Sequence, residues 1–390
     1  MNYRSNKVNG DELSILGFGC MRFPKDEGET EKLVLYAIEH GVNYFDTAFL
    51  YKNSEVTLGR ILSRNDKRKD VKLATKIPPY MVKKYGDLDK IFSQELTRLQ
   101  TDYVDYYFIH MLTDLSVWDR LVALGIKKWL VEKKASGQIR SVGFSYHGGK
   151  DEFVKICDAY LWEFCMIQYN YLDEYNQAGK AGLQHAASKG IPVMIMEPLR
   201  GGVLANNLPK KVAKVFEQAS VRRTPAEWSF RWLWNQAEVT CVLSGMNSME
   251  MVKENIDVAK TSKIGDFTEE DFAVIEKAKK AFMETIKVPC TGCNYCMPCP
   301  HGVDIPTCFS CYNNTVIEGK KAAFIKYVMQ TSLKTKPQIA SLCNKCGQCE
   351  KRCPQKIEIR SELQSTVKTF EKIYFKPILF IAKRFMKIKS

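Results

Sequence analysis

The sequence predicts an α/β fold, a (β/α)8 barrel over residues 1–285, followed by a small helical domain over residues 286–360 and a basic tail over residues 361–390. Three observations lead to this prediction. Short apolar runs alternate with amphipathic stretches up to about residue 260, ten of the 14 cysteines fall between Cys290 and Cys353, and positive charge gathers near the end of the chain. The 390 residues, 45% of them hydrophobic, suffice for one large core and one small one.

Eight apolar runs have the length and composition of buried strands. Eight strands separated by helices within about 250 residues are typical of a (β/α)8 barrel. A doubly wound sheet is the alternative, but Gly17 and Gly19 are not continued into the G-x-G-x-x-G that often follows the first strand of that fold. The expected strands are Leu16–Cys20, Asn43–Asp46, Lys72–Lys76, Val104–Ile109, Ser141–Ser145, Met166–Gln168, Pro192–Met196 and Thr240–Ser244.

Amphipathic stretches between these runs predict the helices. Leu33, Val34, Ala37 and Ile38, for example, have the spacing of one buried helical face. The expected helices are Thr30–Glu39, Asp87–Leu99, Gln177–Lys189, Ala226–Trp234, Glu269–Ile286 and Lys320–Gln330.

Four polar residues lie at or just beyond successive strand ends, where a barrel of this type carries its chemistry. Asp46, Lys76 and His110 end or follow three strands, and Tyr51 lies in the loop after Asp46. Each alone has an ordinary structural explanation, as a helix cap, a packing ring or a satisfied histidine. Together they form a candidate site.

At this point the sequence resembles the aldo-keto reductase family over about residues 1–285. The resemblance rests on six ordered motifs: Leu16-Gly-Phe-Gly-Cys-Met21, Gly41-Val-Asn-Tyr-Phe-Asp-Thr-Ala48, Asn53-Ser-Glu55 with Leu58-Gly59, Ala74-Thr-Lys76, Asp105-Tyr-Tyr-Phe-Ile-His110 and Gly137-Gln-Ile-Arg-Ser-Val-Gly143. It implies a catalytic tetrad of Asp46, Tyr51, Lys76 and His110. A barrel with a vestigial tetrad is the alternative.

The resemblance assigns a role to each tetrad residue. Tyr51 would protonate a carbonyl oxygen as a nicotinamide delivers hydride, His110 would orient that carbonyl, and Asp46 would keep Lys76 charged. A free tyrosine has a pKa near 10, and lowering it to ~7 requires about 4 kcal/mol in favour of the phenolate. A lysine ammonium ~4 Å away supplies roughly that amount at an effective dielectric constant of ~20. We therefore expect Lys76 to lower the pKa of Tyr51.

The resemblance also implies a nicotinamide site, for NADP(H) or NAD(H). Ser145 and Gln168 would hold the carboxamide, with Tyr146 where the family often has Asn and Met196 where it often has an aromatic residue. The basic pair that many members use for the 2′-phosphate aligns with Gly245 and Met251, which weakens the case for a strict NADPH preference. The expected cofactor-binding residues are Gly19, Cys20, Met21, Asp46, Ser145, Gln168, Pro198, Leu199, Gly201, Ser244, Gly245, Met246, Glu254 and Asn255.

Two cysteine runs predict two [4Fe–4S] clusters. The run Cys343-x₂-Cys346-x₂-Cys349-x₃-Cys353-Pro354 matches the bacterial ferredoxin pattern, in which the cysteine before proline binds the other cluster. The run from Cys290 to Pro300 is one residue shorter before its last cysteine. We therefore expect Cys290, Cys293, Cys296 and Cys353 to hold cluster I, and Cys343, Cys346, Cys349 and Cys299 to hold cluster II.

Zinc is the alternative occupant, since C-x₂-C pairs also bind zinc. A third close cysteine and a Cys-Pro ending, each occurring twice, favour iron–sulfur. Cys308 and Cys311 form a further C-x₂-C, which we interpret as buried or free thiols, with cluster ligation as the alternative. A subset of aldo-keto reductases resembles this layout, with a ferredoxin-like domain after the barrel, up to about residue 360.

Residues 320–390 hold 17 Lys and Arg against four Asp and Glu, which is +13 of the total charge of +14. Three interpretations stay open: a solvated face near negatively charged clusters, docking of an acidic redox protein such as a ferredoxin or flavodoxin, and contact with an anionic membrane surface. Nucleic acid is not expected, because no binding motif accompanies the charge. The membrane interpretation rests on Phe375, Ile378, Leu379, Phe380 and Phe385 beside Lys383, Arg384, Lys387 and Lys389.

No secretory signal or membrane span is evident, so we expect a cytoplasmic protein. The expected function is that of an NAD(P)-dependent oxidoreductase acting on a small carbonyl or alcohol, with clusters that transfer electrons. The alternatives are an electron-transfer or docking module whose barrel turns over no carbonyl, and a carbonyl reductase with structural clusters.

Overall fold

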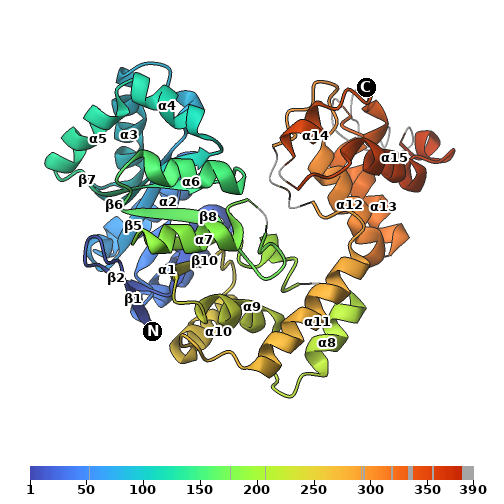
Figure 1. Cartoon of the computed structure of the whole chain (residues 1–390), viewed down its shortest axis with the longest axis horizontal. Helices are drawn as coiled ribbons and strands as arrows, with labels where there is room; N and C mark the ends of the chain where they lie inside the picture. Colours follow the sequence, from blue (N-terminus) through green and yellow to red (C-terminus); the bar gives the residue numbers. More distant parts are fainter. Residues whose placement is uncertain are drawn as a thin grey trace. The chain divides into compact units, whose positions relative to one another are not determined.

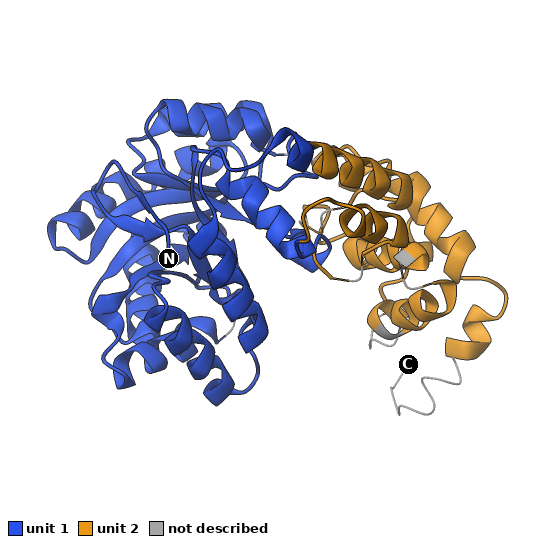
Figure 2. Cartoon of the chain, turned by 90° about the horizontal axis from the view of Figure 1, so that it is seen from below, with its two compact units in different colours: residues 1–204, 223–272 blue, residues 205–222, 273–390 orange. Residues whose placement is uncertain are grey.

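A computed structural model describes residues 1–379, with gaps at residues 52, 176, 207, 291, 293–294, 318, 333–336 and 354. The chain forms two compact units (Figure 2). The first comprises residues 1–204 and 223–272, and the second comprises residues 205–222 and those from 273 onward. The boundaries expected after residues 285 and 360 stay predictions.

The first unit is a closed barrel of eight parallel strands in the order β10-β3-β4-β5-β6-β7-β8-β9 (Figure 1). Apart from β6, which continues three residues past its expected end at Ile109, the strands lie close to the ranges predicted from the apolar runs. The predicted barrel is thus confirmed. The strands are β3 (Leu16–Gly19), β4 (Tyr44–Asp46), β5 (Lys72–Ile77), β6 (Val104–Leu112), β7 (Ile139–Tyr146), β8 (Phe164–Gln168), β9 (Val193–Met196) and β10 (Val239–Ser244).

Helices follow the strands, and several begin at a side-chain cap. Asp26 accepts a hydrogen bond from the backbone N–H of Glu29 at 2.8 Å, and Ser248 caps Met251 in the same way at 3.3 Å. The helices of this unit are α1 (Glu27–Glu39), α2 (Ser54–Arg64), α3 (Gly86–Leu99), α4 (Leu115–Ala123), α5 (Ile126–Ala135), α6 (Lys150–Ala159), α7 (Gly179–Ser188), α9 (Pro225–Trp234) and α10 (Met249–Thr261). Short 3₁₀ turns lie at Cys20–Arg22, Arg68–Asp70, Pro79–Met81 and Arg200–Gly202.

Large side chains fill the inside of the barrel, so it is a packed core and not a pore. These buried residues come from most of the strands and from the N-terminal segment: Leu13, Tyr44, Ala74, Tyr106, Phe108, Phe164, Met166, Met194, Cys241 and Leu243. Outside the strands, Gly59 lets α2 approach α3, because a Cβ at this position would lie 2.4 Å from the carbonyl oxygen of Arg98.

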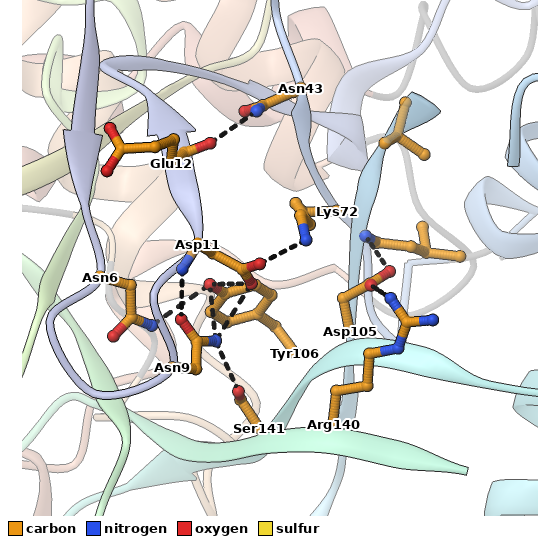
Figure 3. Close-up of polar contacts among 12 residues, drawn as sticks. Asn6, Asn9, Asp11, Glu12, Asn43, Lys72, Asp105, Tyr106, Arg140 and Ser141 are labelled. Carbon is orange, nitrogen blue, oxygen red and sulfur yellow. Dashed lines mark hydrogen bonds and ion pairs between the residues drawn. The ribbon is translucent and has the colours of Figure 1, made fainter. Parts of the chain in front are cut away.

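A short hairpin that the sequence analysis did not predict covers the N-terminal end of the barrel. Its strands, β1 (Tyr3–Ser5) and β2 (Glu12–Ser14), pair in antiparallel fashion. Figure 3 shows how polar side chains join the hairpin to the barrel. The Tyr106 hydroxyl donates to Asp11 at 2.9 Å, and Asn9 donates to Ser141 Oγ at 2.9 Å. This end of the barrel is therefore tied down by hydrogen bonds.

The second unit is helical, as expected for the cysteine-rich region. Its helices are α8 (Lys210–Glu217), most of α11 (Glu269–Thr285), α12 (Ile305–Ile317), α13 (Lys320–Tyr327), α14 (Gln348–Arg352) and α15 (Ile359–Phe370), with a π-helical turn at Val328–Ser332 and a 3₁₀ turn at Ala340–Leu342. Its small core includes Val303, Phe309, Tyr327 and Phe370. Among the described residues, no helix combines the length and apolar character required for a membrane span.

Candidate functional site

The four tetrad residues come from three neighbouring strands of the barrel and the loop between two of them. Asp46 ends β4, Lys76 lies near the end of β5, and His110 lies near the end of β6. Tyr51 lies in the loop before α2, where its backbone N–H donates to the carbonyl oxygen of Ala48 at 2.9 Å. The structure thus brings all four together at the C-terminal end of the barrel.

Asp46 and Lys76 form an ion pair whose side chains are only 4% and 1% exposed. The ammonium group of Lys76 also donates to the carbonyl oxygen of Thr47 at 2.7 Å. Burial raises the pKa of Asp46 and lowers the pKa of Lys76, because each charge has left water. The fixed pair places an ammonium group, with its counter-charge beside it, at the base of the site.

Tyr51 lies above this pair and beside His110. Lys76 Nζ is 5.1 Å from the centroid of the Tyr51 ring, and the rings of Tyr51 and His110 are 6.0 Å apart and nearly perpendicular. The expected lowering of the Tyr51 pKa is wrong for this structure. Burial raises that pKa above its ordinary value, and the negative charges of Asp46 and Glu197 add to the effect. The charge of Lys76 is offset by Asp46, so Tyr51 keeps its proton at neutral pH.

A break in the strand register aims His110 into the site. The pairing of β6 with β7 shifts between Ile109 and Leu112, and Met111 has a φ of 54°. A bulge of this kind redirects a side chain without ending the strand. Burial and the nearby Lys76 hold the pKa of His110 well below 6.5, so its ring is neutral at pH 7. Its Nδ1 atom is buried and has no hydrogen-bond partner among the described residues.

The two residues expected to hold a carboxamide lie at the ends of neighbouring strands. Ser145 Oγ accepts from the backbone N–H of Met111 at 2.8 Å, which leaves its own hydroxyl hydrogen for another acceptor. Gln168 accepts from Gln177 at 2.9 Å and donates to Asp173 at 3.1 Å. One hydrogen and one lone pair of the Gln168 amide are left over, which suits a second amide.

Sequence reasoning missed the buried polar network behind Gln168. Asp173 also accepts from Asn170 at 3.0 Å, and its carboxylate lies 3.4 Å from the guanidinium group of Arg200. The amide and acidic residues that follow β8 are the signal that could have revealed it. Gln177 has a φ of 54°, which nothing in the sequence indicates.

The remaining cofactor-binding candidates lie in the loops at the same end of the barrel. Gly19 ends β3 and Cys20 follows it, with Met21 half exposed. Pro198, Leu199 and Gly201 follow β9 in a turn where Gly201 has a φ of 68°. Ser244, Gly245 and Met246 end or follow β10, and Ser244 Oγ accepts from Asn255 on α10 at 3.0 Å. Glu254, also on α10, accepts a hydrogen bond from Thr224.

In the second unit, a shallow hollow is lined by Cys299, Cys343, Cys346 and Cys349. These are the four ligands expected for cluster II, and Cys299 comes from the other cysteine run. The loop that carries Cys343, Cys346 and Cys349 turns at Lys345 and Gly347, whose φ angles are 65° and 75°. Four cysteine thiols around one hollow are the donor set that a [4Fe–4S] cluster requires.

The cluster I set is described only in part. Cys290, Cys296 and Cys353 pack against the core of the second unit, whereas Cys293 and Pro354 lie outside the described residues. Cys308 and Cys311 are fully buried in that core and do not line the hollow. Their placement agrees with the interpretation as buried thiols.

The basic tail is described up to residue 379. Phe375 is buried in the core of the second unit, and Leu379 packs against that core. Of the apolar residues in the membrane interpretation, Ile378 is exposed, whereas Phe380 and Phe385 lie outside the described residues, as do Lys383, Arg384, Lys387 and Lys389.

Comparison with known proteins agrees with this architecture. Residues 15–280 match the aldo/keto reductase family and residues 289–358 match a 4Fe-4S dicluster domain. Two solved structures of the aldo-keto reductase AKR11C1 from Bacillus halodurans are similar. The holo form has a TM-score of 0.60 and 25% identity, covering 72% of this chain and 97% of that one, and the apo form has a TM-score of 0.59 and 27% identity over the same shares.

Curated relatives are similar over the barrel. The uncharacterized oxidoreductase YqkF of Bacillus subtilis (strain 168) is 27% identical over 71% of this chain and 97% of its own length. The aldo-keto reductase yakc [NADP(+)] of Schizosaccharomyces pombe is 21% identical over 69% of this chain and 90% of its own. The NADP-dependent D-sorbitol-6-phosphate dehydrogenase of Malus domestica is 26% identical over 64% of this chain and 86% of its own. This chain is therefore an oxidoreductase that belongs to the aldo/keto reductase family and carries a 4Fe-4S dicluster domain after its barrel.

Proposed function

We propose that the barrel reduces a small carbonyl compound, or oxidises the matching alcohol, with a nicotinamide cofactor, and that the clusters exchange single electrons. The observation that carries the proposal is the convergence of Tyr51 and His110 over the buried pair of Asp46 and Lys76. These four residues supply a proton donor, a neutral hydrogen-bonding ring and a fixed charge in one place.

Tyr51 is the proton donor of this proposal. Its raised pKa keeps the hydroxyl protonated at neutral pH, which is the form that can donate to a carbonyl oxygen. The neutral His110 ring can hold the same oxygen by a hydrogen bond, because its pKa is lowered. Asp46 keeps the ammonium group of Lys76 beneath the ring, where it favours the negative charge that Tyr51 acquires as the proton leaves.

Ser145 and Gln168 would hold the carboxamide of the nicotinamide, and their unused hydrogen-bonding atoms support this assignment. The bound cofactor would supply hydride to the carbonyl carbon. Both NADP(H) and NAD(H) are candidates. NADP(H) is favoured because the fission yeast and apple relatives are named for it.

The cysteines around the hollow would hold cluster II, whose chemistry is the gain or loss of one electron. Nicotinamide exchanges two electrons as hydride, whereas a cubane exchanges one. The two centres therefore need not react with each other unless a one-electron step links them.

The first test is an anaerobic titration of the cluster-replete protein with NADPH and then with NADH. Visible absorbance and electron paramagnetic resonance are recorded without and with a panel of aldehydes and ketones. We expect NAD(P)H oxidation only when a carbonyl compound is present. Reduction of the clusters by NAD(P)H alone would instead place both centres on one electron path, and no oxidation with any carbonyl would contradict the proposal.

Replacement of Tyr51 by Phe tests the proton donor. We expect Tyr51→Phe to lower kcat for carbonyl reduction by at least 10²-fold, because a positioned acid contributes about 10²–10⁴-fold. The exposed Tyr80 in the turn after β5 provides the control Tyr80→Phe, which should keep the rate within about twofold. Equal rates for wild type and Tyr51→Phe would remove Tyr51 from the mechanism.

A further inference from the structure

One edge of the cluster II hollow is open to solvent. Cys346 is exposed, whereas Cys299, Cys343 and Cys349 are partly buried. Cys346 sits on the loop that turns at Lys345 and Gly347. An electron passes most readily where a redox centre lies nearest to its partner, so this edge is the natural entry point.

Exposed cations surround the same loop. Lys345 precedes the exposed ligand Cys346, Lys351 and Arg352 follow Cys349, and Lys356 follows Cys353 by three residues. We call Lys345, Lys351, Arg352 and Lys356 the cysteine-loop patch. In the part of the chain that the structure describes, none of the four has a carboxylate partner. They are therefore available to an external anion.

The acidic residues of this segment do not neutralise the patch. Between positions 343 and 360, five basic residues face two acidic ones. Glu350 already binds Arg360, with a distance of 2.7 Å between Oε2 and Nη2, and Glu358 is exposed. The Glu350 carboxylate also accepts from the backbone N–H of Arg360 at 2.8 Å. The segment thus presents a net positive field within about a Debye length of the cluster.

The segment lacks what other anionic ligands require. It contains no aromatic residue between positions 343 and 360 on which a nucleic-acid base could stack. Ile357 and Ile359 are buried, so the described part of the segment offers no large apolar side chain to a membrane surface. A charged patch beside a one-electron centre fits a folded acidic protein that carries its own one-electron centre.

We propose that the cysteine-loop patch is the docking surface of an acidic one-electron carrier protein, of the ferredoxin or flavodoxin class. This inference rests on the proposed electron-transfer role of the clusters. In the reducing direction the carrier loses one electron and the cluster held by Cys299, Cys343, Cys346 and Cys349 gains it. No bond forms or breaks, and no other reactant is needed.

The test uses the full-length, cluster-replete protein and a reduced acidic [2Fe–2S] ferredoxin under anaerobic stopped flow. The patch variant combines Lys351→Gln, Arg352→Gln and Lys356→Gln. Lys345 is left unchanged, because it lies between two of the expected cluster ligands. The control variant combines Lys368→Gln, Lys372→Gln and Lys376→Gln, which removes the same charge from exposed residues of the same unit. Lys368 lies eight residues beyond Arg360 on α15, or about 12 Å along the helix.

We expect the second-order rate of cluster reduction to fall about tenfold or more in the patch variant at low ionic strength, and to lose most of its salt dependence. The control variant should change less than about threefold. Iron and sulfide content, the paramagnetic resonance signal and the rate of reduction by dithionite should match the wild type in both variants, which excludes loss of the cluster.

Three results of the kinetic experiment would overturn the docking surface. They are equal slowing in both variants, no slowing in either, and failure of both an acidic ferredoxin and an acidic flavodoxin to exchange electrons with a wild-type cluster that dithionite reduces. Patch-dependent binding to anionic vesicles or to single-stranded DNA without electron exchange would do the same. NADPH-dependent carbonyl reduction is assayed separately in each variant, so failure of the barrel activity is distinguished from failure of docking.

Discussion

Asp46 accepts from Lys76 in a place that water does not reach, so this pair contributes to stability as well as to the site. We expect Asp46→Asn to lower the free energy of unfolding of the barrel by about 3–5 kcal/mol, because it leaves the Lys76 ammonium group buried without a counter-charge. All six tryptophans lie in the first unit, so urea unfolding followed by tryptophan fluorescence reports on the barrel.

The exposed pair of Glu29 and Lys32 provides the control for this measurement. Its side chains are 59% and 67% exposed, so Glu29→Gln should change the free energy of unfolding by no more than about 1 kcal/mol. A similarly small effect of Asp46→Asn would mean that Lys76 becomes neutral in the variant, or that water hydrates the pair more than its low exposure indicates.

His147, beside the site, makes stability depend on pH. Burial lowers the pKa of His147 from 6.5 to about 4, and the hydrogen bond with Gln177 offsets only part of this effect. A lowered histidine pKa means that its contribution to stability is present above pH 6.5 and is lost as the pH falls through 4. We expect the free energy of unfolding to fall by about 2–3 kcal/mol between pH 6.5 and pH 4 because His147 becomes protonated.

The same fluorescence measurement at pH 4, 5, 6 and 7 checks this prediction. His147→Gln should flatten the slope of unfolding free energy against pH, whereas His40→Gln at the end of α1 should leave it steep. If the two variants have the same slope, His147 is not the group that titrates.

At the scale of secondary-structure elements, the N-terminal hairpin is held to the barrel by a cluster of side-chain hydrogen bonds and by the ion pair of Asp11 with Lys72. Tyr106→Phe and Asp11→Asn each disturb the hydrogen bond between these residues (Figure 3), and we expect each to cost about 1 kcal/mol of unfolding free energy. The double variant should cost less than both single costs added together, by about 0.5 kcal/mol or more, because the residues share one interaction.

Tyr85→Phe is the control, since its hydroxyl donates to Glu132 on the surface of the protein and its loss should have a smaller effect than either hairpin substitution. Additive costs for Tyr106→Phe and Asp11→Asn would show that the two residues act on the hairpin independently.

The elements that the sequence predicted are those with a long, regular pattern. Strands such as β6 have enough consecutive apolar residues to identify them, and the helices have a clear buried face. The hairpin has strands of only three residues, and its one signal is Asn9-Gly10, a common hairpin turn. The bulge at Met111 leaves no mark in the sequence, because its positive φ is adopted by a methionine and not by the glycine or asparagine that would indicate such a conformation.

The residues of the candidate site also divide into those that the sequence predicted and those that it did not. The tetrad was predictable because three members stand at or near strand ends and Tyr51 lies in the loop after one of them, and a barrel brings strand ends together. Asp173 and Gln177 were not, because their places depend on a loop whose backbone angles the sequence does not specify. The raised pKa of Tyr51 was not predicted, because the charge of Lys76 can be inferred from the sequence but the free-energy cost of burying a phenolate cannot.

At the scale of the whole molecule, the two units differ in what sustains their cores. The barrel is filled by large side chains, whereas the second unit has a small core against which most of the cysteines expected to hold the clusters pack. We expect removal of iron with a chelator to abolish amide hydrogen-exchange protection in α12 and α15, because the cysteines that pack against this small core would lose the clusters that hold them together.

The barrel strands should keep their protection in the same sample, so they provide the internal control. Unchanged exchange in α12 and α15 after complete loss of iron would mean that the clusters do not stabilise the second unit. Loss of protection in both units would mean that they unfold together.

The first residues of the chain are fastened to some of the last residues of the barrel. The Asn2 side chain donates to the carbonyl oxygens of Ala259 and Ser262, at 3.0 and 2.8 Å, and these partners lie 257 and 260 positions further along. Ribosomes add roughly 5–20 residues per second, so Asn2 waits about 13 to 50 seconds for its partners to be synthesised. During that interval the nascent barrel has an open seam, and a chaperone that binds unpaired strands would find its substrate there.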